Sequence, residues 1–474
     1  MAWGADMDLH PHMFREYDIR GIAGVELTPR LVEELGRVFA ALAREAAGSA
    51  RGQPLSVAVG RDGRLSSPEL GAALTRGLAA GGLRVIDLGL TTSPGLYFAT
   101  HHCATDAGIM ITGSHNPPDY NGLKMVRFGA PFFGAGIQEI RQRLEAGGAA
   151  PVPGGTVEQQ SILDAHVARM TADFRPGRRV KVVLDCGNGA AGPVAQALLQ
   201  RLPGIEGEVL FPEPDGRFPN HHPDPTLPEN LEYLRRRMTA TGAELGIAFD
   251  GDGDRLGALD EQGRIVWGDR LMILFARQLL RESPGATIIG DVKCSQLLFD
   301  AVAAAGGRPL MWKTGHSLIK AKMKETGAPL SGEMSGHLFF ADRYLGFDDA
   351  LYGAMRLMEL VASEPTPLSR RLADLPTVHA TPELRIDCPD DRKFQVMERI
   401  ARDRKAAGGD IAEVDGIRVR LPDGAWWLLR VSNTQPALVA RVEARSPERL
   451  AEVADQVARL LQAQGVAFPS WQAS

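Results

Sequence analysis

A short strand pattern that runs into a glycine-rich turn and then a helix recurs three times along the chain. The three openings are SVAVGRDGR at 56–64, KVVLDCGNGAAG at 181–192 and ATIIGDVKCS at 286–295. Each combines β-branched residues, a turn and a helical period, which is typical of a βαβ crossover in a parallel sheet. Their spacing of roughly 110–125 residues is too long for a solenoid repeat. The pattern therefore predicts three α/β domains in tandem.

Changes in composition indicate where these domains end. A stretch rich in Gly and Pro at 145–155 predicts the first boundary, and the pattern restarts near 260–270. After about residue 365, alternating apolar residues predict an antiparallel sheet that is closed by an amphipathic helix. We therefore expect an α/β protein with mixed or parallel sheets and a smaller C-terminal α+β domain around a central cleft, divided at 1–155, 156–262, 263–372 and 373–474.

Charge and targeting signals exclude several classes of protein. The net charge of −5 argues against a nucleic-acid binder, which needs a basic face. No apolar run reaches the roughly 20 residues of a membrane span, and the N-terminus lacks the pattern of a signal peptide. The four cysteines lie far apart without CxxC spacing, which predicts reduced thiols and a cytoplasmic location. An anionic substrate would have to be attracted by local Arg and Lys clusters.

The sequence GIMITGSHNPPDYNGLK at 108–124 places a serine directly after a predicted strand. Glycine and prolines around Ser114 predict an exposed turn, and ligands of such sheets gather at the carboxyl ends of strands. A plain Ser/Asn turn is the alternative reading. A serine hydrolase is disfavoured, because there is no GxSxG motif and we expect His115 to point away from the Ser114 hydroxyl.

The sequence IAFDGDGDRLGALD at 247–260 places three carboxylates at alternate positions after a strand. Asp250, Asp252 and Asp254 would repel one another without a cation between them. Oxygen ligands in this number suit Mg²⁺ or Ca²⁺. An EF-hand has similar spacing, but Arg255 stands where that loop requires glycine, and the preceding element is a predicted strand. We predict a metal site here, with Mg²⁺ preferred.

Two further loops carry polar groups. In PLSGEMSGHLFF at 329–340, Glu333, Ser335 and His337 alternate and present groups that suit sugar hydroxyls. In LLRVSNTQPALVARVEA at 428–444, a guanidinium, two hydroxyls and an amide make a compact phosphate cradle. A structural or surface turn is the alternative for each loop. The cradle residues are Arg430, Ser432, Asn433 and Thr434.

Together and in this order, the four loops resemble those of the α-D-phosphohexomutase superfamily, and most nearly its bacterial phosphomannomutase/phosphoglucomutase branch. The resemblance runs from FREYDIRG at 14–21 to the closing helix. It implies reversible phosphoryl transfer between the 1- and 6-positions of mannose or glucose phosphates, through a phosphorylated Ser114 and a hexose 1,6-bisphosphate. The Glu-Met-Ser loop favours these sugars over glucosamine phosphates. It also implies a monomer, while the net charge and the short apolar runs argue against nucleic-acid and membrane partners.

The resemblance assigns roles residue by residue. Ser114 would be phosphorylated, and Asp250, Asp252 and Asp254 would bind Mg²⁺ with a phosphoserine oxygen. Glu333 and Ser335 would hold sugar hydroxyls beside His337, and the cradle would bind the distal phosphate. Other positions that match the family's site are Tyr17, Arg20, His115, Lys124, Arg255, Lys293 and His316.

Phosphoryl transfer from a phosphoserine needs charge neutralisation and a general base. Arg20, Lys124 and Arg255 are the expected cations, and His316, Lys124 and His115 are all candidates for the base. The bisphosphate must turn over in the site, which predicts a hinge for the C-terminal domain near 366–380. A phosphatase and a non-catalytic sugar-phosphate sensor are the competing hypotheses.

Overall fold

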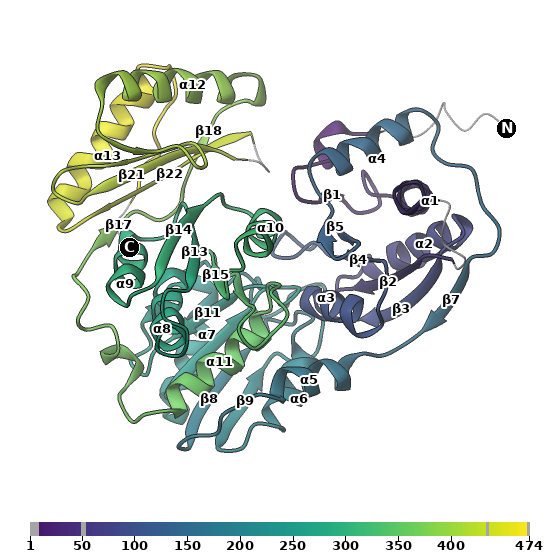
Figure 1. Ribbon diagram of the computed structural model, residues 1–474, viewed down its shortest axis with the longest axis horizontal. Helices are drawn as coiled ribbons and strands as arrows, with labels where there is room; N and C mark the ends of the chain where they lie inside the picture. The colour runs from purple at the N-terminus through teal and green to yellow at the C-terminus, as the bar shows by residue number, and fades with distance from the viewer. Residues whose placement is uncertain (1–8, 49–53, 433–435, 472–474) are drawn as a thin grey trace.

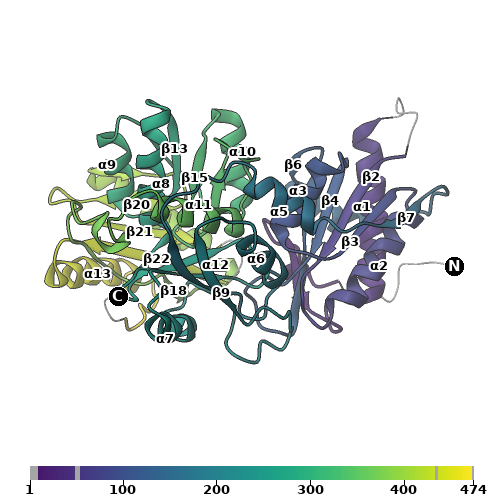
Figure 2. The same ribbon diagram turned by 90° about the horizontal axis from the view of Figure 1, so that it is seen from below.

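The computed structural model describes residues 9–48, 54–432 and 436–471. Its secondary structure forms four sheets with helices packed on their faces, arranged as four domains along the chain (Figure 1). Seen from below, the first domain lies at one side and the later domains lie together at the other (Figure 2). The expected α/β architecture with a C-terminal α+β domain is confirmed.

The first sheet has the order β1-β5-β4-β2-β3-β7, with β6 paired to β5. Its central strands are parallel, and β5 and β1 are antiparallel additions at one edge. The last strand follows residue 155, so the sheet continues past the boundary expected from composition. The elements are η1 (Pro11–Met13), β1 (Ile19–Ile22), α1 (Pro29–Ala47), β2 (Ser56–Arg61), α2 (Ser67–Ala80), β3 (Arg84–Leu90), α3 (Ser93–His102), β4 (Ala107–Ile111), β5 (Tyr120–Arg127), β6 (Ala130–Pro131), α4 (Ala135–Glu145) and β7 (Thr156–Gln159).

The second sheet has the order β12-β11-β10-β8-β9, with the parallel pairs β8–β9 and β8–β10 at its centre. The strand β10 ends at Phe249, directly before the three aspartates, as the sequence predicts. The elements are α5 (Leu163–Thr171), β8 (Val180–Asp185), α6 (Gly192–Leu199), β9 (Ile205–Leu210), η2 (Pro228–Leu231), α7 (Glu232–Thr241), β10 (Leu245–Phe249), β11 (Leu256–Leu259) and β12 (Ile265–Val266).

The third sheet has the order β14-β13-β15-β16 and is parallel except for its edge strand β16. Its helix α11 begins where Asp349 accepts a hydrogen bond from the Tyr352 N–H, and it packs against the second sheet as well as its own. The elements are α8 (Gly268–Glu282), β13 (Thr287–Asp291), α9 (Gln296–Ala304), β14 (Arg308–Trp312), α10 (His316–Thr326), β15 (Leu330–Gly332), β16 (Leu338–Phe340), α11 (Ala350–Ala362) and η3 (Leu368–Arg370).

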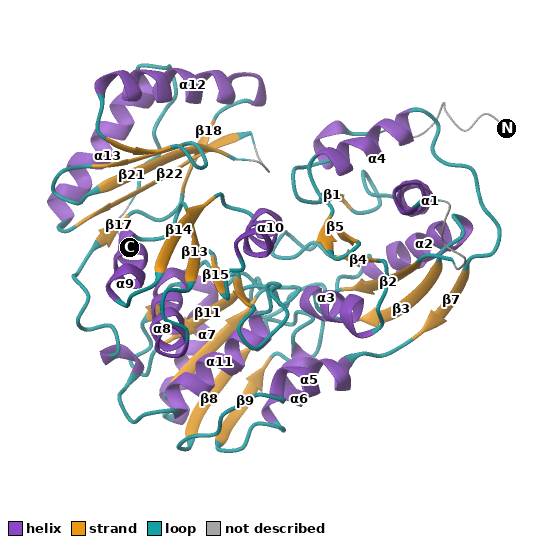
Figure 3. Ribbon diagram, in the orientation of Figure 1, coloured by secondary structure: helices purple, strands orange, loops and turns teal. Residues whose placement is uncertain are grey.

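The C-terminal sheet is antiparallel, with the order β17-β22-β21-β20-β19 and β18 paired to β22 (Figure 3). Side chains of β21 alternate between two environments. Trp427 and Leu429 join the core under the domain's own helices, whereas Trp426 and Leu428 pack on Val292 of the third domain. The elements are β17 (His379–Ala380), β18 (Leu384–Asp387), α12 (Asp390–Ala407), β19 (Asp410–Ala412), β20 (Ile417–Arg420), β21 (Trp426–Val431), β22 (Ala437–Ala444) and α13 (Pro447–Gln462).

The apolar cores show which domains are firmly joined. The largest cluster is continuous from α3 of the first domain through the second and third domains, whereas the C-terminal domain has a separate core. A buried cation reinforces the C-terminal junction: the Arg418 guanidinium stacks on Trp426 at 3.7 Å and donates to the carbonyl oxygens of Val292 and Cys294. Within the described part of the chain, no helix is long and apolar enough to cross a membrane.

Candidate active site

The Ser114 turn follows β4 and is backed by a buried arginine. Ser114 has a left-handed φ of 49° and is only 2% exposed. The Arg64 guanidinium donates to four carbonyl oxygens of this loop, at 2.7 Å to Ser114 and 2.6 Å to Asn116. The other two acceptors are Pro117 and Tyr120. The turn follows a strand as expected, but the expectation that it is exposed at Ser114 is wrong, because the serine is packed between Arg64 and the Gly251 backbone.

Glycine is required next to this serine. A Cβ atom at Gly113 would lie 2.5 Å from the Arg64 guanidinium. The loop is further fixed by Asp62, which accepts from the Thr112 hydroxyl at 2.8 Å and the Gly113 N–H at 3.2 Å. Burial lowers the pKa of Arg64, and the neighbouring Asp62 carboxylate opposes that effect.

Replacement of Arg64 by lysine is expected to destabilise the protein. A lysine ammonium cannot reach four carbonyl groups at once, so buried acceptors lose their donors. We expect the free energy of unfolding, measured in urea, to fall by roughly 2–4 kcal/mol. The control is Arg30→Lys on the exposed start of α1. Equal stability of the two variants would contradict this role of Arg64.

The aspartate loop of the second domain contacts the serine loop directly. The Ser114 hydroxyl donates to Asp250 Oδ2 at 2.9 Å. A Cβ atom at Gly251 would lie 2.4 Å from the Ser114 carbonyl oxygen, so only glycine permits this approach. The sequence predicted each loop separately, and the fold brings them together.

The three aspartates fit a divalent cation. Asp250, Asp252 and Asp254 are completely buried, and one carboxylate oxygen of each lies within 4.8 Å of the others. Among the residues that the structure describes, Asp252 Oδ1 and Asp254 Oδ1 have no hydrogen-bond partner. Burial and the two neighbouring carboxylates raise the pKa of Asp250 well above its usual range. Oxygen donors, uncompensated charge and orphaned acceptors together suit a hard cation.

Lys124 supplies the positive charge nearest to these carboxylates. Its ammonium lies 2.7 Å from Asp252 Oδ2 and 2.5 Å from Asp254 Oδ2. Although burial opposes the charged form, these two carboxylates raise the pKa of Lys124 well above its usual value. The charged form of Lys124 is therefore favoured, and this form can neutralise negative charge on a phosphoryl group.

A pair of histidines faces a carboxylate that the sequence analysis did not single out. His337 Nε2 accepts from Arg255 Nε at 3.0 Å, so the ring proton of neutral His337 is on Nδ1. That nitrogen lies 3.2 Å from Asp348 Oδ2 and 3.6 Å from Asp254 Oδ1. His316 Nδ1 lies 3.7 Å from the same Asp348 oxygen. Burial and Lys320 lower the pKa of His316 well below its usual value, so this ring is neutral.

His115 does not point away from the serine, so that expectation is wrong. Its Nδ1 lies 3.2 Å from Ser114 Oγ. The physical reason is tertiary: Arg64 donates to the carbonyl oxygens of Ser114 and Asn116, on either side of His115, and so fixes the path of the loop. Burial, followed by repulsion from Arg255, lowers the pKa of His115 well below its usual value.

The N-terminal segment reaches across to the third domain. The Tyr17 hydroxyl donates to the Thr314 carbonyl oxygen at 2.9 Å, and its ring packs edge-on to His316. Arg20 donates to Asn116 Oδ1 at 2.8 Å and to Asp18 at 2.5 Å. These contacts place both residues beside the serine and histidine loops.

The loop between β15 and β16 is a tight hairpin. Glu333 Oε2 accepts from the Ser335 hydroxyl at 3.1 Å, and Glu333 Oε1 accepts from the Gly315 N–H at 3.1 Å. Burial raises the pKa of the Glu333 carboxyl. His337 points instead toward Asp254 and Asp348. Glu333 and Ser335 therefore contact each other, whereas His337 faces the aspartates.

Two cations at the junction of the third and C-terminal domains are paired with carboxylates. Arg430 Nε lies 2.8 Å from Asp415 Oδ2, which also accepts the Thr314 N–H at 3.2 Å. Lys293 donates to Glu383 at 2.9 Å. Ser432 is buried at the end of the described segment. Asn433 and Thr434, which complete the predicted cradle, lie outside the described residues.

The Lys293–Glu383 pair predicts an acid-dependent loss of stability. Attraction to Lys293 lowers the pKa of Glu383 from 4.5 to about 2. A lowered folded-state pKa adds stability above pH 4.5, and this stability disappears as the pH falls toward 2. Glu383→Gln should lower the free energy of unfolding at pH 7 by about 1–2 kcal/mol and reduce its dependence on pH in that window. Urea titrations at several pH values test this, with the exposed pair variant Glu325→Gln as control.

Comparison with known proteins decides the family. Models of phosphoglucomutase/phosphomannomutase domains match in order: alpha/beta/alpha domain I over 11–150, domain II over 163–263, domain III over 267–379 and the C-terminal domain over 383–460. A phosphomannomutase/phosphoglucomutase of Pseudomonas aeruginosa is 47% identical over 441 residues, which is 93% of each chain. The chain belongs to the phosphoglucomutase/phosphomannomutase family.

Other members of the family are similarly close. A phosphoglucomutase of Neisseria gonorrhoeae is 45% identical over 435 residues, covering 91% of this chain and 93% of its own. The crystal structure of a phosphoglucomutase/phosphomannomutase family protein from Burkholderia thailandensis superposes with a TM-score of 0.88 at 44% identity, covering 98% and 99% of the two chains. The resemblance that the four loops indicated is confirmed.

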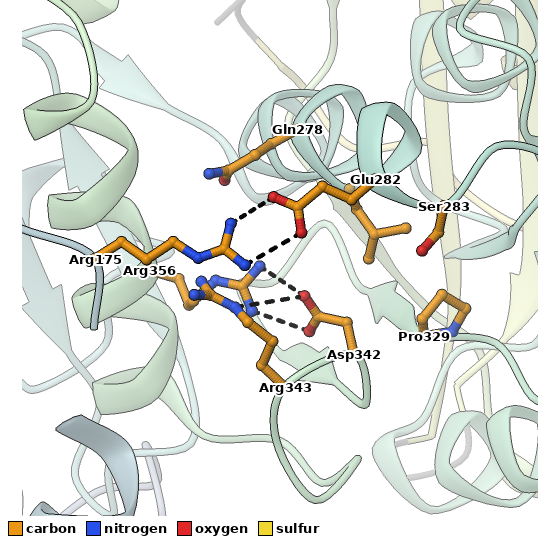
Figure 4. A pocket seen from close by; sticks show the side chains of 9 residues that line it. Arg175, Gln278, Glu282, Ser283, Pro329, Asp342, Arg343 and Arg356 are labelled. Atoms are coloured by element: carbon orange, nitrogen blue, oxygen red, sulfur yellow. Dashed lines mark hydrogen bonds and ion pairs between the residues drawn. The ribbon is translucent and has the colours of Figure 1, made fainter. Parts of the chain in front are cut away.

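A separate cavity of about 160 Å³ lies at the junction of the second and third domains (Figure 4). Its walls are ion pairs: Arg175 with Glu282, and Arg356 with Asp342. Pro329, which lines the cavity, precedes β15, whereas the Glu333 hairpin follows that strand. The cavity therefore lies at the opposite end of β15 from the candidate active site. The Arg175–Glu282 pair joins the second and third domains, whereas Arg356 and Asp342 both belong to the third domain.

Proposed function

We propose that the protein is a hexose phosphate mutase that moves a phosphoryl group between the 1- and 6-positions of mannose or glucose phosphates. The observation that carries this proposal is the contact of the Ser114 hydroxyl with Asp250, which joins a phosphoryl acceptor to a buried carboxylate cluster. Members of the family that are named phosphomannomutase/phosphoglucomutase support the same activity. We also propose that the four domains comprise residues 1–155, 156–262, 263–372 and 373–474.

In this mechanism Asp250, Asp252 and Asp254 would hold Mg²⁺ together with phosphorylated Ser114. The ion, when bound, neutralises charge on the transferring phosphoryl group. Lys124 is placed to do the same from within the carboxylate cluster, and Arg255 and Arg20 add positive charge at its border. A fixed array of cations needs no reorganisation when charge moves during transfer.

Each transfer breaks one phosphorus–oxygen bond and forms another. The phosphorus–Oγ bond of phosphoserine breaks while a sugar hydroxyl oxygen bonds to phosphorus, and the hydroxyl proton passes to a histidine. His316 is neutral and can therefore accept it, and His337 lies beside the same Asp348 carboxylate. His115 remains a candidate for moving a proton at Ser114 Oγ itself.

Substrate binding uses the two remaining loops. Glu333 and Ser335 would hold sugar hydroxyls, while Arg430, Ser432, Asn433 and Thr434 would bind the distal phosphate with Lys293 and Tyr17 nearby. The intermediate, a hexose 1,6-bisphosphate, must turn over so that its other phosphate faces Ser114. The separate core of the C-terminal domain supports hinge motion near 366–380. Crystal structures with and without sugar phosphate that show no domain displacement would contradict the hinge.

The test is an assay that separates transfer from hydrolysis. With Mg²⁺ and a trace of hexose 1,6-bisphosphate, the enzyme should convert mannose 1-phosphate and glucose 1-phosphate to the 6-phosphates without releasing inorganic phosphate. Release of phosphate in proportion to turnover would instead identify a phosphatase, and no turnover of either sugar would favour a sensor. We propose that the active form is a cytoplasmic monomer, which sedimentation of the same preparation tests for oligomeric state.

A further inference from the structure

Two histidines and a glutamate converge on the surface of the first domain. His10 and His12 flank Pro11 at the start of η1, and Glu26 lies in the turn between β1 and α1. One ring nitrogen of each histidine and one carboxylate oxygen all lie within 4.8 Å of one another. This histidine cluster belongs to none of the four loops that form the candidate active site.

The cluster is preorganised. His12 Nε2 lies 2.7 Å from Glu26 Oε1, and the two histidine rings are 5.6 Å apart. Glu26 Oε2 accepts the Ile22 N–H at 2.8 Å, which fixes the carboxylate and directs Oε1 at the rings. Pro11 restricts the backbone between the two histidines. An orienting hydrogen bond of this kind behind a ligand is typical of metal sites.

The chemistry of the donors selects the ion. Two imidazoles and one carboxylate suit Zn²⁺ and related transition metals, whereas the aspartate cluster offers only oxygen and suits Mg²⁺. We propose that His10, His12 and Glu26 form a binding site for a divalent transition metal, with Zn²⁺ as the best match. Three protein ligands leave a fourth tetrahedral position for water, because the His12 side chain is 56% exposed.

Metal binding would brace the segment that leads into the active site. The ion would link η1 to the turn after β1, and the intervening Met13 and Phe14 are already buried. Tyr17 and Arg20 follow directly in the chain. Because the three ligands come together only in the folded protein, Zn²⁺ should raise the thermal unfolding temperature.

Titration with Co²⁺ and Zn²⁺ in excess Mg²⁺ tests the proposal, because Mg²⁺ fills the oxygen-donor site. Wild-type protein should give the visible absorption of a tetrahedral Co²⁺ site, which Zn²⁺ then displaces with one-to-one stoichiometry. His10→Ala/His12→Ala should abolish this signal, and Glu26→Gln should weaken Zn²⁺ binding at least about tenfold.

The matched control is His101→Ala/His102→Ala, which removes two exposed adjacent histidines elsewhere in the first domain. This variant should bind Co²⁺ and Zn²⁺ like the wild type. The proposal is overturned if the histidine-cluster variants also bind like the wild type, or if no tetrahedral spectrum forms. Mutase activity is not needed for any readout, so the outcome is independent of the proposed function.

Discussion

Ser114→Ala should abolish both the phosphoenzyme and the mutase activity. The Ser114 hydroxyl contacts Asp250 and is the group that we expect to carry the phosphoryl group, and alanine removes it without disturbing the carbonyl contacts of Arg64. We expect kcat to fall at least about a thousandfold on both sugars. Intact-protein mass after incubation with hexose 1,6-bisphosphate should show one phosphoryl group on the wild type and none on the variant.

The matched control for this experiment is Ser283→Ala, at the rim of the distant cavity between the second and third domains. That variant should keep the phosphoryl group and the wild-type rate. Circular dichroism of all three proteins should coincide, because the alanine side chain fits the positive-φ turn no worse than serine. Full activity in Ser114→Ala would refute the phosphoserine mechanism and leave the Ser114 turn as a structural feature.

The sequence predicted the fold well where the signal was local. The three strand–turn–helix openings became β2, β8 and β13 with the helices that follow them, and the alternating apolar residues of the C-terminal domain became β20, β21 and β22. Packing between distant segments had no such signal. The helix α11 rests on the second sheet, and β7 extends the first sheet beyond residue 155, because both depend on contacts made only in the folded chain.

The same distinction applies to the site. Ser114 and the aspartates stand in dense glycine-containing turns after strands, so their pattern is visible in the sequence. Arg64 and Asp348 are single charged residues whose importance comes from burial and from partners far along the chain. Two sequence signals could have indicated these residues: the RDGR turn at the end of β2 for Arg64, and the Asp348–Asp349 pair before α11 for Asp348. The orientation of His115 could not be predicted, since the path of its loop depends on contacts with Arg64, which lies far away in the sequence.

Asp250→Asn should affect activity and stability in opposite directions. Three buried carboxylates share the one ammonium of Lys124, so the metal-free site carries unbalanced negative charge. Asparagine keeps the shape of the residue, and its Oδ1 can still accept the N–H groups of Asp254 and Arg255. Removing one charge should therefore raise the free energy of unfolding of metal-free protein by about 1–3 kcal/mol.

The same substitution should lower kcat at least about a hundredfold, because it weakens the cation site and replaces the acceptor for the Ser114 hydroxyl. Thermal unfolding with and without Mg²⁺ separates the two effects: Mg²⁺ should stabilise the wild type far more than the variant. Asp260→Asn, on the turn after β11, provides a control aspartate outside the cluster. A metal-free Asp250→Asn variant that is less stable than the wild type would contradict this prediction. It would mean that protonation already relieves the repulsion among the three carboxylates, so that the cluster is stable without a cation.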